Sequence, residues 1–357
     1  MSSIYKSYLE LELEGSSHSE MITLRIKNFP SGYKINYDLI DKNLKLRRPS
    51  FVFNTPRIEE DKYYFASGVK NEKTTGDMIT ICVLNSNLKS SCYTKGECRA
   101  NHADYPAYVK YGEDFDYRGG GQFSGRMTVP FVILGSMCSD ILASKNIEIG
   151  TRIKEVLDIK DDEEFNINLV SKFNNSNFPM VNEDKKNELI EKLSNIKDDT
   201  VGGMLESYIL NLEVGVGDPF FDSLESKISH MLFSIPSCKG VMFGEGVNLV
   251  HSLGSEVIDE LEIKDEKINI KSNHMGGING GLSNGNPIKI STIFKPIASI
   301  KKPYNSINIL NKQNIKLINK GRHDIFMLNR CCVIVNSFLA LTILDILLKE
   351  NKLWNTD

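Results

Sequence analysis

Apolar and polar residues alternate one by one in two short stretches near the start of the chain. Residues 9–14 alternate leucine with glutamate, and residues 22–27 alternate aliphatic residues with threonine, arginine and lysine. Successive side chains of a β-strand point to opposite faces, so this period of two predicts two half-buried strands. Residues 63–69 and 79–84 are further strand candidates. The first 90 residues therefore predict an antiparallel sheet rather than alternating strands and helices.

Longer apolar patterns predict helices in four places, at residues 38–48, 129–145, 224–235 and 330–349. Pro49 and Pro236 directly follow two of them, and proline ends a helix because the residue before it avoids helical geometry. A strand is expected to end at Phe294. Residues 155–200 are rich in lysine, aspartate and asparagine around one amphipathic helix over 183–196, which predicts a peripheral, solvent-facing insertion with little function.

Four polar loops combine glycine or other small residues with histidine or arginine, at residues 15–19, 99–128, 272–285 and 320–324. None of them has the glycine spacing of a dinucleotide-binding or Walker phosphate loop. Taken singly, each is ordinary turn chemistry and each histidine is more often structural than catalytic. Together, four histidines in such loops suit general acid–base chemistry, because imidazole titrates near physiological pH.

Composition narrows the class of protein. The chain has 357 residues, 41% apolar and 25% charged, which is the composition of a globular protein. Its net charge of −3 provides no general basic field for nucleic acid or an anionic membrane. The first residues lack the apolar core of a signal peptide, and the longest apolar stretch, residues 331–348, contains Asn336, Ser337 and Asp345. We therefore expect a soluble, cytoplasmic protein.

Seven cysteines, without a Cys-x-x-Cys pair, argue against a disulfide framework and a zinc site, and no metal site is expected. Eight arginines lie in or near the polar loops: Arg47, Arg48, Arg57, Arg99, Arg118, Arg126, Arg322 and Arg330. Any one of them is usually a solvated or salt-bridged residue. As a group, they predict a focused pocket for a multiply anionic ligand, but they do not name a reaction.

The order of motifs resembles the chorismate synthase family from about residue 10 to residue 350. Gly15-Ser-Ser-His-Ser19 is similar to the family's GESHG, and Arg47-Arg-Pro49 is similar to its RRRPG. Asn101-His-Ala-Asp-Tyr105 is similar to GHADY. Lys110-Tyr-Gly112 and Tyr117-Arg-Gly-Gly-Gly121 are similar to KYG and DYRGGG. The later motifs continue in the family's order, at residues 217–222, 234–240, 272–278, 295–300 and 320–324.

The resemblance implies an α+β fold, a β-α-β sandwich with antiparallel sheets, in which residues 1–357 form a single domain and 155–200 the insertion. It implies a lyase of the shikimate pathway of aromatic amino acid biosynthesis, a flavoprotein that converts 5-enolpyruvylshikimate 3-phosphate to chorismate by 1,4-elimination of phosphate. The family requires reduced FMN without net redox change and assembles as a homotetramer. Because the chain has no nucleotide fingerprint, an external flavin reductase is the expected partner.

The resemblance also assigns residues by motif. The catalytic positions are His18, which protonates the departing phosphate, Ser17 beside it, His102 near flavin N1, and Asp324 near flavin N5. The flavin-binding positions are Gln122, Phe123, Ser124, Pro236, Ser237, Gly280, Lys295, Pro296, Ile297, Ala298, Ser299 and Arg322. The candidates for the phosphate and carboxylates of the substrate are Arg47, Arg48, Arg57, Arg126 and Arg330.

Several motifs depart from the family's pattern. GESHG loses its acidic residue and last glycine, and the usual GGGRSSARET reads Gly-Gly-Gly-Gln-Phe-Ser-Gly-Arg-Met-Thr, with Gln122 and Phe123 in place of arginine and serine. KPTSS becomes Lys-Pro-Ile-Ala-Ser, which removes two hydroxyl groups, and HDPC becomes His-Asp-Ile-Phe. Weaker FMN affinity is one expectation. A non-catalytic flavin- or anion-binding descendant and a flavin-dependent lyase for a related anionic ring are the alternatives.

Overall fold

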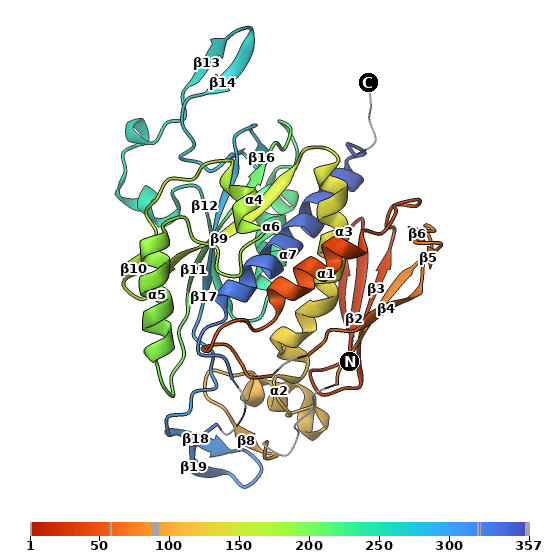
Figure 1. Cartoon of the computed structure of the whole chain (residues 1–357), viewed down its shortest axis with the longest axis vertical. Helices are drawn as coiled ribbons and strands as arrows, with labels where there is room; N and C mark the ends of the chain where they lie inside the picture. The colour runs from red at the N-terminus through yellow and green to blue at the C-terminus, as the bar shows by residue number, and fades with distance from the viewer. Residues whose placement is uncertain (1, 58, 87–92, 320, 322, 354–357) are drawn as a thin grey trace.

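Two antiparallel sheets enclose a layer of helices (Figure 1). The structure is a computed structural model, and it describes residues 2–57, 59–86, 93–319, 321 and 323–353. One buried apolar cluster runs from Leu9 to Leu353 and fills the space between the sheets. The predicted α+β class, with a β-α-β sandwich, is confirmed.

The first sheet has five strands in the order β1-β2-β3-β7-β4. They are β1 (Ser2–Lys6), β2 (Glu10–Glu14), β3 (Met21–Lys27), β4 (Tyr63–Ser67) and β7 (Ile79–Leu84). The predicted alternation holds in β3, where Leu24 and Ile26 are buried while Arg25 reaches Glu14 at 2.8 Å on the outer face. The four predicted strands of this sheet are confirmed, whereas β1 was not expected because its residues are mostly exposed and show no alternation.

The second sheet has the order β10-β9-β11-β17-β12 and is also antiparallel. Its strands are β9 (Glu148–Val156), β10 (Ile159–Lys160), β11 (Gly203–Leu210), β12 (Cys238–Phe243) and β17 (Ile288–Phe294). Only β17 was predicted. β9 and β11 were not predicted because each has a charged residue at a buried position, which interrupts the apolar pattern of a strand. These residues, Arg152 and Glu206, form a buried pair in which Arg152 Nη2 donates to Glu206 Oε1 at 2.7 Å.

The helical layer consists of α1 (Tyr37–Arg47), α3 (Val129–Ala143) and α7 (Leu328–Lys349), as predicted. α3 and α7 pack so closely that a Cβ on Gly135 would lie 2.3 Å from Ser337 Cβ. By length and composition, Gly125–Ala143 and Leu328–Lys349 could each cross a membrane, but 78% and 94% of these windows are buried. In this structure both are core helices.

The remaining elements are shorter. Helices at the periphery are α2 (Asp104–Tyr111), α4 (Leu169–Phe173), α5 (Glu183–Asn195) and α6 (Leu224–Phe233), and α5 and α6 were predicted. A small sheet next to α2 joins β8 (Glu97–Cys98), β18 (Tyr304–Asn308) and β19 (Gln313–Leu317). The hairpins pair β5 (Val69–Lys70) with β6 (Lys73–Thr74), β13 (Leu261–Lys264) with β14 (Lys267–Ile270), and β15 (Ile278–Asn279) with β16 (Leu282–Ser283).

Residues 155–200 lie on one side of the second sheet, where α5 forms an outer edge of the molecule (Figure 1). Lysine and glutamate of α5 form ion pairs such as Lys186–Glu183 at 3.0 Å. Its apolar face is nevertheless buried, because Leu189 and Leu193 join the main core together with Phe178. The segment therefore contributes to the core as well as to the surface.

Candidate functional site

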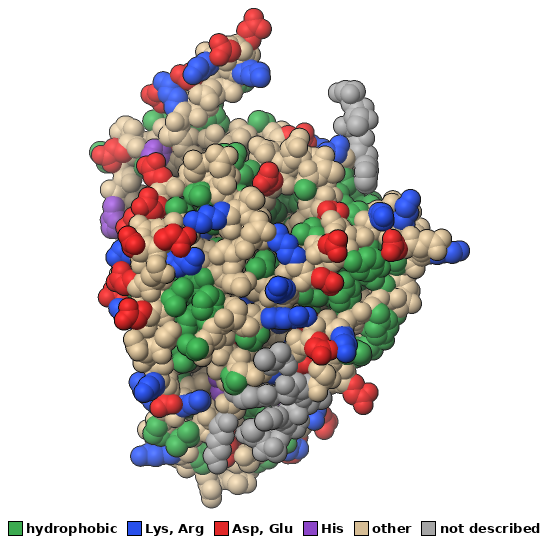
Figure 2. Space-filling view, in the orientation of Figure 1, with side chains coloured by type: hydrophobic (Ala, Val, Ile, Leu, Met, Phe, Trp, Pro, Cys, Tyr) green, Lys and Arg blue, Asp and Glu red, His purple; other side chains and the backbone are tan. Residues whose placement is uncertain are grey.

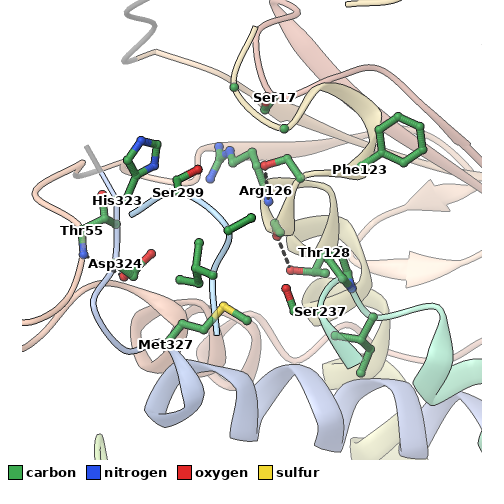
Figure 3. Close-up of a pocket in the computed structure, with 18 of the residues that line it drawn as sticks. Ser17, Thr55, Phe123, Arg126, Thr128, Ser237, Ser299, His323, Asp324 and Met327 are labelled. Atoms are coloured by element: carbon green, nitrogen blue, oxygen red, sulfur yellow. Dashed lines mark hydrogen bonds between the residues drawn. The ribbon is translucent and has the colours of Figure 1, made fainter. Parts of the chain in front are cut away.

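A cavity of about 610 Å³ lies at one end of the helical layer, within the range of small-molecule sites. Its wall comes from the β2–β3 loop, the segment after α1, the loop before α3, the segments after α6 and β17, and the start of α7. Figure 3 shows Arg126, Ser299, His323, Asp324 and Met327 around it. Residues more than 300 positions apart in the sequence thus meet in one site.

The loop between β2 and β3 holds Ser17 and His18 at the cavity. Both are buried, and Ser17 Oγ lies 3.1 Å from His18 Nδ1, a contact that orients the imidazole. Gly119 allows this approach, because a Cβ there would lie 2.5 Å from His18 Cε1 and its φ of +58° favours glycine. The ring also meets Tyr93 edge-on, with centroids 5.6 Å apart.

His102 reaches the cavity from the turn before α2. Its Nδ1 lies 2.8 Å from Asp104 Oδ1, and Asp104 also accepts two hydrogen bonds from the Arg99 side chain, at 2.7 and 2.8 Å. Burial acts to raise the pKa of Asp104, but the hydrogen bonds from Arg99 and His102 outweigh it and hold that pKa well below its usual range. Asp104 is therefore a fixed anion that orients His102. Asn101 has a φ of +59°, which explains why asparagine can stand where the family motif has glycine.

Asp324 lines the cavity from the segment just before α7. Its Oδ1 accepts from the backbone N–H of Thr55 at 2.7 Å and from Arg330 Nη2. His323, beside it, also lines the cavity. Burial, aided by the positive charges of Arg99 and Lys301, lowers the pKa of His323 to about 4, so this imidazole is neutral at physiological pH.

Three arginines surround one buried carboxylate on the cavity wall. Asp61 pairs with Arg47 at 3.8 Å, with Arg48 at 3.9 Å, and with Arg126 through a direct hydrogen bond. Arg126 also donates to Asn85 Oδ1 at 2.8 Å. Burial lowers the pKa of Arg47 to about 10, an effect that Asp61 opposes.

Arg57 forms a separate pair with Glu59, whose Oε1 accepts from its Nε at 2.9 Å and from its Nη2 at 2.6 Å. Burial acts to raise the pKa of Glu59, but hydrogen bonds from Arg57 and Ser86 lower it overall. Glu59 is thus held as an anion that fixes Arg57 beside the Ser17 loop, since Arg57 Nη2 also approaches the carbonyl oxygen of Ser17 at 3.5 Å.

The wall of the cavity is strongly cationic. Among the described lining residues, eight are cationic and three are acidic: Arg47, Arg48, Arg57, Arg99, Arg126, Arg330, Lys239 and Lys295 against Glu59, Asp61 and Asp324. The buried Nε atoms of Arg48 and Arg330 have no hydrogen-bond partner among the described residues. The excess of cationic side chains around the cavity suits an anionic ligand.

All four predicted catalytic residues and all five predicted substrate arginines line this cavity. Of the predicted flavin positions, the cavity wall contains Gln122, Phe123, Ser124, Pro236, Ser237, Lys295, Ile297, Ala298 and Ser299. Pro296 is exposed between two lining residues, and Gly280 lies in the exposed turn between β15 and β16; neither is among the lining residues. Arg322 lies outside the described residues. The roles of these residues stay predictions.

Sequence reasoning did not single out several lining residues, including Thr55, Glu59, Asp61, Tyr93 and Met327, whereas His323 was one of the four loop histidines considered for acid–base chemistry. The sequence could have indicated Glu59 and Asp61, because these acidic residues follow the candidate Arg57 within four positions and could balance its charge. Thr55 had no such signal, because it contributes its backbone N–H to Asp324, and any residue type except proline supplies that donor.

The fold and the cavity define an α+β protein, a β-α-β sandwich with a cationic cavity of the size of small-molecule sites. The chain belongs to the chorismate synthase family, whose model, described as "Chorismate synthase", matches residues 9–348. Chorismate synthase of Korarchaeum cryptofilum is 34% identical over 355 residues, 98% of each chain, and that of Methanocaldococcus jannaschii is 34% identical over 365 residues, 97% of this chain and 96% of the relative.

A solved structure, "Crystal Structure of Chorismate Synthase", supports the fold. It superposes with a TM-score of 0.72 over 98% of this chain and 93% of that chain, at 21% sequence identity. The predicted family is therefore confirmed, and the relatives show that the family is one of enzymes.

Proposed function

We propose that this protein is an active chorismate synthase, which eliminates phosphate from 5-enolpyruvylshikimate 3-phosphate to form chorismate. The observation that carries the proposal is the meeting, at one cationic cavity, of His18 with Ser17, of His102 with Asp104, and of Asp324 with Arg330. An anion-binding relic has no need for three positioned proton-transfer groups. In this reaction a ring C–H bond and the C–O bond to phosphate break, and a second ring double bond forms.

The phosphate end of the substrate fits the arginine side of the cavity. Arg47, Arg48 and Arg126 offer guanidinium groups that bind phosphate oxygens, as charge-assisted hydrogen bonds do elsewhere. His18, which Ser17 contacts at Nδ1, lines the cavity and would give a proton to the departing phosphate. Phosphate leaves more readily once protonated, so this transfer lowers the barrier.

The residues present fit a reduced FMN. When bound, it would supply an electron-rich ring that stabilises the developing positive character at the allylic centre. Lys295, Ser124 and Ser237 line the wall and would hold its polar groups. Ser237 has a φ of +74°, an unusual backbone held by Lys295 N–H donating to the Ser237 carbonyl at 3.0 Å. His102, fixed by Asp104, would hold a proton near flavin N1, and Asp324 would act near N5.

A non-catalytic flavin- or anion-binding descendant is the second candidate, favoured by one observation. Ile297 and Ala298 line the cavity where the family motif offers hydroxyl groups, and Phe123 replaces a serine there. These changes remove hydrogen-bond donors and are expected to weaken FMN binding. An anaerobic FMN titration that gives tight binding would remove this support.

The expected setting of the reaction follows from the family and the sequence. We propose a cytoplasmic homotetramer that receives reduced FMN from an external reductase, because the sequence has no dinucleotide fingerprint. The substrate is a small molecule, and neither nucleic acid nor a membrane is an expected partner. NADPH with oxidised FMN should give no turnover, whereas chemically reduced FMN should.

The decisive experiment mixes the purified protein anaerobically with chemically reduced FMN and 5-enolpyruvylshikimate 3-phosphate. Chorismate absorbance and free phosphate are followed together. Equal amounts of the two products support the proposal. Binding of both ligands without product would contradict it and favour the non-catalytic descendant, with residues 122–127 the first segment to restore to the family pattern.

A further inference from the structure

Asp61 lies at the centre of the arginine cluster, although a carboxylate by itself repels an anionic ligand. Its side chain is 1% exposed and sits in the segment before β4, while its three partners come from the end of α1 and the turn before α3. Arg47, Arg48 and Arg126 each form their ion pair with this one group. Asp61 therefore joins its own segment to two others, the end of α1 and the turn before α3.

The cluster of Asp61 and its three arginines carries a net positive charge. Three guanidinium groups against one carboxylate give a net charge of +2, which matches the charge of about −2 on a phosphate monoester. Arg48 contributes its Nε to the pair with Asp61, at 3.9 Å. The cluster thus keeps an excess of positive charge for a ligand.

The same network reaches the loop that carries His18. Asn85 accepts from Arg126 Nε at 2.8 Å and donates through Nδ2 to the carbonyl oxygen of Ser19 at 2.8 Å. Arg126 Nη2 donates to the Leu84 carbonyl at 3.1 Å. Asp61, through Arg126 and Asn85, is linked to the loop of the proposed proton donor.

We infer that Asp61 is a positioning residue, which holds the guanidinium groups of Arg47, Arg48 and Arg126 in the arrangement that binds the phosphate group of the substrate. The inference rests on the proposed function for the identity of the substrate. Mere charge balance is the competing explanation. The two explanations predict opposite changes in phosphate affinity when the charge of Asp61 is removed. Loss of a negative charge alone tightens the binding of an anion, whereas loss of the arginine geometry weakens it.

Asp61→Asn and Asp61→Glu separate the two explanations. Asp61 has a φ of +53°, which asparagine adopts readily, and the chain already holds Glu72 and Glu266 at φ of +61°, so both variants suit the backbone. We expect inorganic phosphate, titrated calorimetrically into the purified protein, to bind about tenfold more weakly to both variants, the size of one charge-assisted hydrogen bond. Wild-type or tighter binding in either variant would overturn the inference.

Two further measurements exclude a structural effect. Glu206→Gln breaks another buried pair, Arg152–Glu206, away from the cavity; it should lower the Tm without changing phosphate affinity. In an Arg126→Gln background, Asp61→Asn should weaken phosphate binding by less than about threefold, because one of the groups it positions is gone. Full additivity would contradict a positioning role.

Turnover distinguishes the two proposals. Asp61→Asn should lower kcat as well as raise KM, because Arg126 is linked to the His18 loop. A wild-type protein that binds phosphate in an Asp61-dependent way, but forms no chorismate, would contradict the proposed function alone. A wild-type protein that forms chorismate with unchanged kinetics in Asp61→Asn would contradict this inference alone.

Discussion

At the scale of the residue, the cavity places two histidines in opposite electrostatic surroundings. His102 faces the fixed anion Asp104, whereas burial, aided by nearby positive charges, lowers the pKa of His323 to about 4. A neutral His323 can donate and accept one hydrogen bond each beside an anionic ligand without adding charge.

Because folding lowers the pKa of His323 below 6.5, the unfolded chain binds the proton more tightly. The stabilisation from the neutral imidazole is complete above pH 6.5 and is lost as the pH falls from 6.5 to 4. It amounts to about 3 kcal/mol in the free energy of unfolding. Urea unfolding across this pH range should show a shallower pH dependence in His323→Gln than in the wild type; identical slopes would refute the assignment.

His18→Ala and His102→Ala test the proposed proton transfers. Each should lower kcat by roughly 10- to 1,000-fold, as expected for loss of a general acid. FMN binding and the oligomeric state should be unchanged, which titration and light scattering would check. Should FMN binding fall as far as kcat, the histidine would be a structural part of the site instead.

At the scale of the element, the helical layer depends on close contact between α3 and α7. Gly135 faces Ser337, and a Cβ at position 135 would lie 2.3 Å from Ser337 Cβ and 2.4 Å from its Cα. Because both atoms belong to the other helix near its backbone, the helices would have to move apart. Asp324 and Arg330 flank the start of α7, so this packing also positions the cavity wall.

Gly135→Ala should therefore lower the free energy of unfolding by about 1–3 kcal/mol, the cost of overpacking a core. Chemical denaturation measures this directly. Gly254→Ala is the matched control, since a Cβ there meets nothing within 4 Å. A Gly135→Ala variant as stable as the control would show that α3 and α7 have room to spare.

At the scale of the whole molecule, the β13–β14 hairpin projects from the body (Figure 1). Figure 2 shows charged side chains of both signs along it. Ile263 and Ile268 are opposite each other in the register and are 81% and 78% exposed. An isolated hairpin with an exposed apolar pair is marginal in water, so a covering surface would stabilise it.

We expect another copy of the chain to cover this hairpin in the proposed homotetramer. The double variant Ile263→Ser with Ile268→Ser should shift the mass measured by light scattering towards smaller species, because it removes apolar surface from the contact. Val52→Ser is a control, since Val52 is 84% exposed but lies in another part of the chain. An unchanged mass would remove the hairpin from the assembly interface.

Much of the fold was readable from residue patterns. Four of the five strands of the first sheet, and the helices α1, α3, α5, α6 and α7, follow from alternation, helical spacing and proline, which act locally. The second sheet was largely missed because its strands bury a charged pair, Arg152 with Glu206, which reads as surface sequence until the partner is known. α2 was missed inside a segment rich in glycine and aromatic residues.

The sequence by itself determined the family, the helical layer and the residue types of the site, because motifs in order and periodic burial are properties of the chain alone. Only the tertiary structure decided which charges meet. Asp61 meets Arg126 from a segment 65 residues away, and His323 lies near Arg99 and His102, which are more than 200 residues away in the sequence. Electrostatic energy depends on distance and burial in space, so it is set only when the chain has folded.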